Sequence, residues 1–149
     1  MSSAATSLAA RILGRRTPTY ATREHARVRV ARATRRLDAV VAFYRDGLGL
    51  PVIESFHNHA GYSGVILGMP GGAHLEFTQH DTANRSAPPD ADDLLVFYFP
   101  TLAKVARLRR RLEYLGYRCV QPVNPYWLER SVSFEDPDLW RVVLCAAAG

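Results

Sequence analysis

Alternating residues of the segment AHLEFTQ (73–79) place groups that can hold protons on one face of a predicted strand. His74, Glu76 and Thr78 are spaced two apart, and side chains two apart in a strand share a face. A carboxylate in a partly desolvated site tends to have a raised pKa and can act as a general base. We therefore predict that Glu76 is the catalytic residue if the protein is an enzyme, and that His74 contacts the ligand. An ion pair between Glu76 and an arginine is the alternative.

An arginine can share that face with Glu76. The segment HARVRV (25–30) alternates and contains β-branched residues, so it predicts a strand on which His25 and Arg29 point the same way. Arginine offers a two-pronged donor for a carboxylate or phosphate, which makes Arg29 a candidate ligand-binding residue. An internal ion pair with Glu76 would use the same guanidinium group, and both interpretations stay open.

Aromatic residues form a second set of candidates. Tyr98 alternates with apolar residues in a predicted strand, and Tyr62 opens another predicted strand. Tyr126 and Trp127 lie in the proline-containing loop QPVNPYWLE. Aromatic rings that line a cavity can stack on flat apolar ligands. We predict that all four bind a ligand, with ordinary core packing as the alternative.

The composition and charge of the chain exclude several classes of protein. Of 149 residues, 48% are apolar and 22% are charged, which is typical of a globular domain and not of a coiled coil or a disordered chain. No apolar run approaches a membrane span. The net charge of +5 comes from nine arginines before residue 37, so the remaining chain is mildly acidic and does not predict a nucleic-acid partner. Cys119 and Cys145 lie in apolar stretches, which favours reduced thiols and a cytoplasmic protein.

The first 24 residues are expected to form a basic, flexible tail. They are rich in Ala, Ser, Thr and Arg, with no acidic residue before Glu24. The same composition is compatible with an organelle transit peptide, which is the alternative localisation.

Two similar series of elements follow the tail. The hydrophobic periodicity predicts helices at 38–48, with Asp38 as N-cap, and at 102–115. It predicts strands at 25–30, 51–56, 62–68, 73–79, 94–99, 117–120, 130–135 and 140–145. The order is βαβββ twice, with modules at 25–80 and 94–146 joined by a polar linker at 81–93. The predicted fold class is therefore α+β.

The two modules also align in sequence at an offset of 67 residues. Leu48 and Gly49 align with Leu115 and Gly116, and Pro70 aligns with Pro137. One βαβββ module cannot cover its own sheet, so the repeat predicts two modules that complete each other. We expect two cupped sheets that form an open, barrel-like mixed sheet around a cavity, with the helices outside.

The chain resembles the vicinal oxygen chelate superfamily, which includes glyoxalase I, bleomycin-resistance proteins and extradiol dioxygenases, and in it looks closest to small bacterial members. The resemblance covers about residues 25–146. It rests on AVVAFYRDGLGL (39–50), GAHLEFTQ (72–79), LEYLGY (112–117), SFEDPDLWRVVL (133–144) and the loop NPYW (124–127).

The resemblance implies a metal site of which this chain keeps only part. Metal-dependent members use a His at the start of the first strand and a Glu on the last strand of each module. The matching residues are His25 and Glu76 in the first module but Leu94 and Val143 in the second, which cannot bind a metal. We therefore expect no cofactor. The alternative is a divalent ion such as Zn, Ni, Mn or Fe held by His25, Glu76 and donors from a second copy or from nearby histidines.

These observations predict a protein that binds a small, partly aromatic molecule in the cup between its modules. Sequestration of that molecule, as in the resistance proteins, is one form of this function, and we expect a homodimer. The alternative is a metal-dependent lyase, isomerase or dioxygenase in which Glu76 is a ligand or base.

Overall fold

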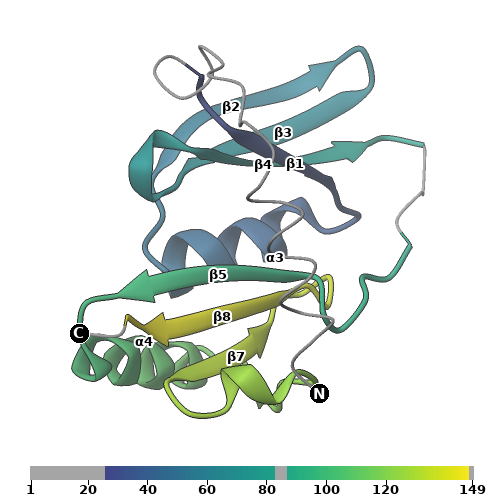
Figure 1. Cartoon of the computed structure of the whole chain (residues 1–149). Helices are drawn as coiled ribbons and strands as arrows, with labels where there is room; N and C mark the ends of the chain where they lie inside the picture. The colour runs from purple at the N-terminus through teal and green to yellow at the C-terminus, as the bar shows by residue number, and fades with distance from the viewer. Residues whose placement is uncertain (1–25, 83–86, 148–149) are drawn as a thin grey trace, which may run out of the picture.

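The computed structural model describes residues 26–82 and 87–147 (Figure 1). The predicted tail and His25 lie outside these residues, as does part of the predicted linker. The first module forms one sheet in the order β1-β4-β3-β2, in which β1 runs parallel to β4 and the other neighbours are antiparallel. Its elements are β1 (Arg29–Ala33), α3 (Leu37–Ala42), the π-helical turn η1 (Phe43–Gly47), β2 (Val52–His59), β3 (Tyr62–Gly68), η2 (Pro70–Gly72) and β4 (His74–His80).

The second module repeats this topology. Its sheet has the order β5-β8-β7-β6, with β5 parallel to β8. The elements are β5 (Leu94–Phe99), α4 (Leu102–Tyr114), β6 (Cys119–Val120), η3 (Pro125–Trp127), β7 (Ser131–Glu135) and β8 (Arg141–Ala146). The α+β fold of two βαβββ modules is thus confirmed. No helix of the described residues is long and apolar enough to cross a membrane.

Strand register reproduces the sequence repeat, except in the first strand of each module. Leu67 pairs with Leu75 in the first sheet, and Phe134 pairs with Val142 in the second, so β3 and β4 match β7 and β8 at the predicted offset of 67. In contrast, Arg29 pairs with His74, and Leu94 pairs with Arg141, which gives an offset of 65 between β1 and β5. The residue that matches Leu94 is therefore Arg29, and the expectation that a strand begins at His25 was wrong.

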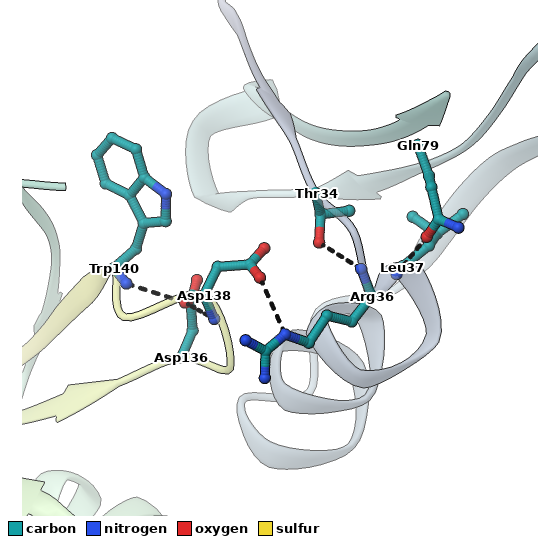
Figure 2. A network of polar contacts seen from close by, with 7 residues as sticks. All are labelled: Thr34, Arg36, Leu37, Gln79, Asp136, Asp138 and Trp140. Carbon is teal, nitrogen blue, oxygen red and sulfur yellow. Dashed lines mark hydrogen bonds and ion pairs between the residues drawn. The ribbon is translucent and has the colours of Figure 1, made fainter. Parts of the chain in front are cut away.

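The start of α3 also differs from the prediction. Asp38 was expected to cap this helix, but the N-cap position is Arg36, whose side chain makes no capping bond. Instead, the amide side chain of Gln79 in β4 accepts a hydrogen bond of 2.9 Å from the backbone N–H of Leu37 (Figure 2). A group from a distant strand thus satisfies a helix-end donor that local sequence does not. The second helix follows the ordinary rule, because Thr101 caps α4 through Lys104 N.

The helices, not the open faces of the sheets, join the two modules. Figure 1 shows α3 between the two sheets, and the buried core runs from Phe77 of β4 through Tyr44 to Leu112 of α4 and Leu144 of β8. Residues of β4 and β8 that alternate with these core positions point away from the helices. The sheets of the described residues are not closed into a barrel, so these residues do not enclose the cavity expected between the sheets.

Polar contacts border this core where the modules meet. The turn between β7 and β8 lies near the start of α3, and Arg36 Nε approaches Asp138 Oδ1 to 3.6 Å (Figure 2). The guanidinium group of Arg32 lies 4.0 Å from the ring centre of Trp140, which is a cation–π geometry. These contacts fix the relative position of the modules at one edge of the core.

Candidate functional site

The polar candidates of the first module form one cluster. Arg29 Nη1 donates to Glu76 Oε2 and Arg29 Nη2 contacts His74 Nδ1, both at 3.3 Å. Because a guanidinium group has only donors, His74 Nδ1 is the acceptor in this contact. Glu76 is 15% exposed in its side chain and Arg29 is 44% exposed, so the pair lies at the surface of the sheet. The internal ion pair expected from the sequence therefore forms, and the role of Arg29 in ligand binding stays a prediction.

The described donors of this cluster do not fit a divalent metal. Among the described residues of this cluster, the candidate ligands are His74 and Glu76, and the positively charged guanidinium group of Arg29 contacts both. Within residues 26–82 and 87–147, no group of three or more His, Cys, Asp or Glu side chains could hold a metal ion. Arg29 also occupies the strand position that matches Leu94, where the resemblance implied a histidine. The metal role of His25 stays a prediction, since His25 lies outside the described residues.

Tyr62 is separated from the other aromatic candidates. It opens β3 opposite His80 of β4, and the two rings meet edge to face with centroids 4.5 Å apart. Tyr62 is 45% exposed. It shares no described pocket with Tyr98, Tyr126 or Trp127, and its role in ligand binding stays a prediction.

The other three aromatic candidates line a single pocket on the second module. Its volume is about 730 Å³, and it opens to solvent. Tyr98 comes from β5, whereas Tyr126 and Trp127 form η3, so the fold brings together rings that lie far apart in the sequence. The remaining lining residues are Pro125, Glu129, Arg130, Ser131, Cys145, Ala146 and Ala147. We call this the aromatic pocket.

Local hydrogen bonds hold η3 in place at this pocket. Asn124 Oδ1 accepts a 3.0 Å bond from Tyr126 N, which caps the short helix, and Pro125 occupies its first turn. The hydroxyl of Ser131 donates to the carbonyl of Trp127 and so ties η3 to β7. The rings of Tyr126 and Trp127 are perpendicular, with centroids 4.8 Å apart. Two adjoining walls of the pocket are therefore aromatic and differently oriented.

Arg130 is a pocket residue that the sequence analysis missed. It precedes β7, and its side chain bends back onto the end of β8, where Nε donates to Ala146 O at 3.3 Å and Nη2 donates to Ala147 O at 2.9 Å. The only sequence signal was its position shortly after the NPYW loop. Its contacts with residues 16 and 17 positions later could not be read from local patterns.

Comparison with known proteins places this fold in a family. A model described as the YycE-like N-terminal domain matches residues 28–78, and a YycE-like C-terminal domain model matches residues 92–146. The uncharacterized protein YycE of Bacillus subtilis (strain 168) is 42% identical over 125 residues, which cover 83% of this chain and 90% of that protein. The chain belongs to the YycE-like family.

Solved structures agree with this membership of the YycE-like family. A crystal structure of a YycE protein of unknown function from B. subtilis matches with a TM-score of 0.81 and 40% identity, covering 87% of this chain and 96% of that chain. The trypanothione-dependent glyoxalase I of Leishmania major (TM-score 0.65, 17% identity) covers 83% and 87% of the two chains. The fosfomycin resistance protein FosX of Mesorhizobium loti (TM-score 0.63, 14% identity) covers 80% and 90%. At such identities these two matches show the vicinal oxygen chelate fold alone, which confirms the resemblance found in the sequence.

Proposed function

We propose that this protein binds a small, partly aromatic molecule in the aromatic pocket and so sequesters it. The observation that carries the proposal is that Tyr98 and the pair Tyr126–Trp127, from separate elements, line one pocket of about 730 Å³. This volume lies in the range of small-molecule sites, which are mostly apolar with a few polar groups. Tyr98 is 61% exposed and Tyr126 is 76% exposed, so their rings are available to a ligand.

The proposal includes a second copy of the chain that covers the pocket. The helices already join the two modules within one chain, which leaves the strand face that carries Arg29 and Glu76 pointing away from the second module. In a homodimer, that polar face of one copy can lie opposite the aromatic pocket of the other. Val28 precedes the edge strand β1 and is 61% exposed, and Val30 lies in β1 and is 38% exposed. Both would be buried in such a contact. We also propose a cytoplasmic location, as the sequence predicts.

A ligand screen with two matched variants tests the proposal. Purified protein is screened by thermal shift against flat bicyclic aromatic compounds, because a ligand at about 100 times its Kd stabilises the protein by about 2.7 kcal/mol. We expect several compounds to raise the melting temperature of the wild type, with smaller shifts for Trp127→Ala. Tyr114→Ala is the matched control, since Tyr114 is 90% exposed on α4 and lies outside the pocket. The proposal fails if no compound raises the melting temperature, or if Trp127→Ala responds like the wild type.

A further inference from the structure

Arg130 is the basic side chain of the aromatic pocket, and its fixed position carries information about the ligand. Two hydrogen bonds, to Ala146 O at 3.3 Å and Ala147 O at 2.9 Å, hold the guanidinium group at the end of β8. The backbone holds the same segment, because Ala146 N donates to Arg130 O at 2.8 Å. A side chain that is already ordered loses less conformational entropy when it binds a ligand.

The charge of Arg130 is not neutralised within the described part of the chain. Both of its acceptors are uncharged carbonyl groups, and none of the ion pairs among residues 26–82 and 87–147 involves Arg130. Its third nitrogen, Nη1, makes no hydrogen bond to a described residue. Nη1 and the second N–H of Nη2 point along the same edge of the planar group, which is the edge that binds a carboxylate through two parallel bonds.

The remaining polar groups of the pocket do not compete for this edge. The hydroxyl of Ser131 is already bonded to Trp127 O, and the thiol of Cys145 contacts Ala146 O at 3.5 Å. Glu129 also lines the pocket, is exposed, and forms no ion pair with Arg130. Arg130 is exposed as well, so its attraction for an anion depends on a direct charge-assisted hydrogen bond.

From this geometry we propose that the ligand is an aromatic carboxylate, whose ring lies against Tyr126 and Trp127 and whose carboxylate binds Arg130. The inference rests on the proposed function, because it names the chemical class of ligand for the same pocket. An aromatic cation is disfavoured, since it would meet the uncompensated charge of Arg130. A neutral ring would stack equally well but would leave the free edge of the guanidinium group unused.

Matched probes and variants test this assignment. Binding of 2-naphthoate and of its neutral isostere 2-naphthamide is measured by isothermal titration calorimetry at low ionic strength. We expect the carboxylate to bind the wild type about tenfold more tightly than the amide, because bonds between ionised groups are stronger than neutral ones. Arg130→Met keeps most of the aliphatic stem and should abolish this preference, whereas Arg130→Lys should keep part of it. Arg109→Met removes an arginine from the exposed face of α4, where it binds Glu113, and should keep the full preference.

The outcomes separate this inference from the proposed function. If both probes bind equally, and both lose affinity in Trp127→Ala, the pocket binds aromatic rings but the carboxylate assignment is wrong. The assignment is also wrong if Arg130→Met keeps the preference. If neither probe binds at millimolar concentration, the assignment and the proposed pocket both fail. Near-ultraviolet circular dichroism of each variant verifies the fold, and Arg130→Lys serves as the charged variant if Arg130→Met does not fold.

Discussion

Tyr44 Oη donates a 2.7 Å hydrogen bond to Asp136 Oδ2, and this buried bond joins the two modules. Tyr44 belongs to η1 of the first module, and Asp136 follows β7 of the second. The other carboxylate oxygen accepts from Asp138 N at 2.8 Å and from Trp140 N at 3.0 Å. One carboxylate therefore shapes the turn before β8 and anchors that turn to the neighbouring module.

Replacement of Tyr44 by Phe should destabilise the protein. The variant keeps the ring packed against Phe77 but leaves one oxygen of Asp136 buried without its donor. We expect the free energy of unfolding to fall by about 1–3 kcal/mol, as measured by urea denaturation. Tyr114→Phe removes a hydroxyl from an exposed ring and should change it by less than about 0.5 kcal/mol. Equal effects of the two substitutions would contradict a structural role for the bond.

The stability of the protein should depend on pH through Asp136. Burial raises the pKa of this carboxyl group, although the bonds from Tyr44 and from two backbone N–H groups act in the opposite direction. The folded state then binds the proton more tightly than the unfolded state does. The group therefore stabilises the fold fully below its ordinary pKa of about 3.9, and this contribution is lost as pH rises through the raised pKa.

Comparison with Asp136→Asn isolates this contribution. Asn is neutral throughout, can accept the two backbone bonds, and can donate to Tyr44. Urea denaturation from pH 4 to pH 7 should show the wild type losing stability relative to Asp136→Asn, by about 1.4 kcal/mol for each unit of raised pKa. A difference that stays constant, or that changes in the opposite direction, would show that the pKa is not raised.

A side chain at Gly47 should destabilise the protein, because this residue lies against Leu112 of α4. A Cβ atom at this position would lie 2.6 Å from Leu112 Cδ2 on α4. We expect Gly47→Ala to lower the free energy of unfolding by about 1–3 kcal/mol. Leu112→Ala alone should cost about 2–5 kcal/mol, because it opens a cavity in the core. The double variant should cost clearly less than the sum of the two, since the new methyl group fills part of that cavity. Additive costs would place the two residues out of contact.

Removal of Arg29 should raise the affinity of the first sheet for divalent metal. A unit positive charge about 4 Å from a divalent ion opposes binding by about 2 kcal/mol even at the dielectric constant of water. Arg29→Ala should therefore bind Zn²⁺ at least about tenfold more tightly than the wild type in calorimetry. The gain should vanish in the double variant with Glu76→Ala. Arg45→Ala, which removes an exposed arginine paired with Asp46, is the control. Tight stoichiometric Zn²⁺ binding by the wild type would instead restore the metal-dependent alternative.

Local patterns predicted most elements but not the positions that depend on distant pairing. β3 and β5 have the predicted bounds, because each is a short alternating or apolar run between turn residues. β1 was placed too early, since alternation continues through residues 25–30 and cannot say where pairing begins. The pairing of Arg29 with His74 of β4 decides where β1 begins. Likewise, the local sequence predicted Asp38 as the cap of α3, whereas the backbone N–H of Leu37 bonds to Gln79. A hydrogen bond between residues 42 positions apart leaves no local signal.

The sequence predicted which residue types could form a site but not which of these residues lie together. The alternation of Arg29, His74 and Glu76 correctly placed them on one face, where Arg29 contacts both of the other side chains. The sequence placed the aromatic residues and Arg29 around one cup. In the structure Tyr98, Tyr126 and Trp127 line one pocket together with Arg130, whereas Arg29 and Tyr62 belong to the other sheet. Whether these residues bind a ligand stays a prediction that the experiments above decide.

The separate sheets have a consequence for how this chain could be divided and reassembled. Among the described residues no strand ladder crosses between the modules, and the contacts that join them include Tyr44 with Asp136, Gly47 beside Leu112, and Arg36 with Asp138. A chain cut between β4 and β5 therefore breaks no β-ladder. Two such fragments, expressed together, carry complementary surfaces for reassociation, and hybrids with halves from related proteins need to preserve side-chain contacts rather than a shared β-ladder.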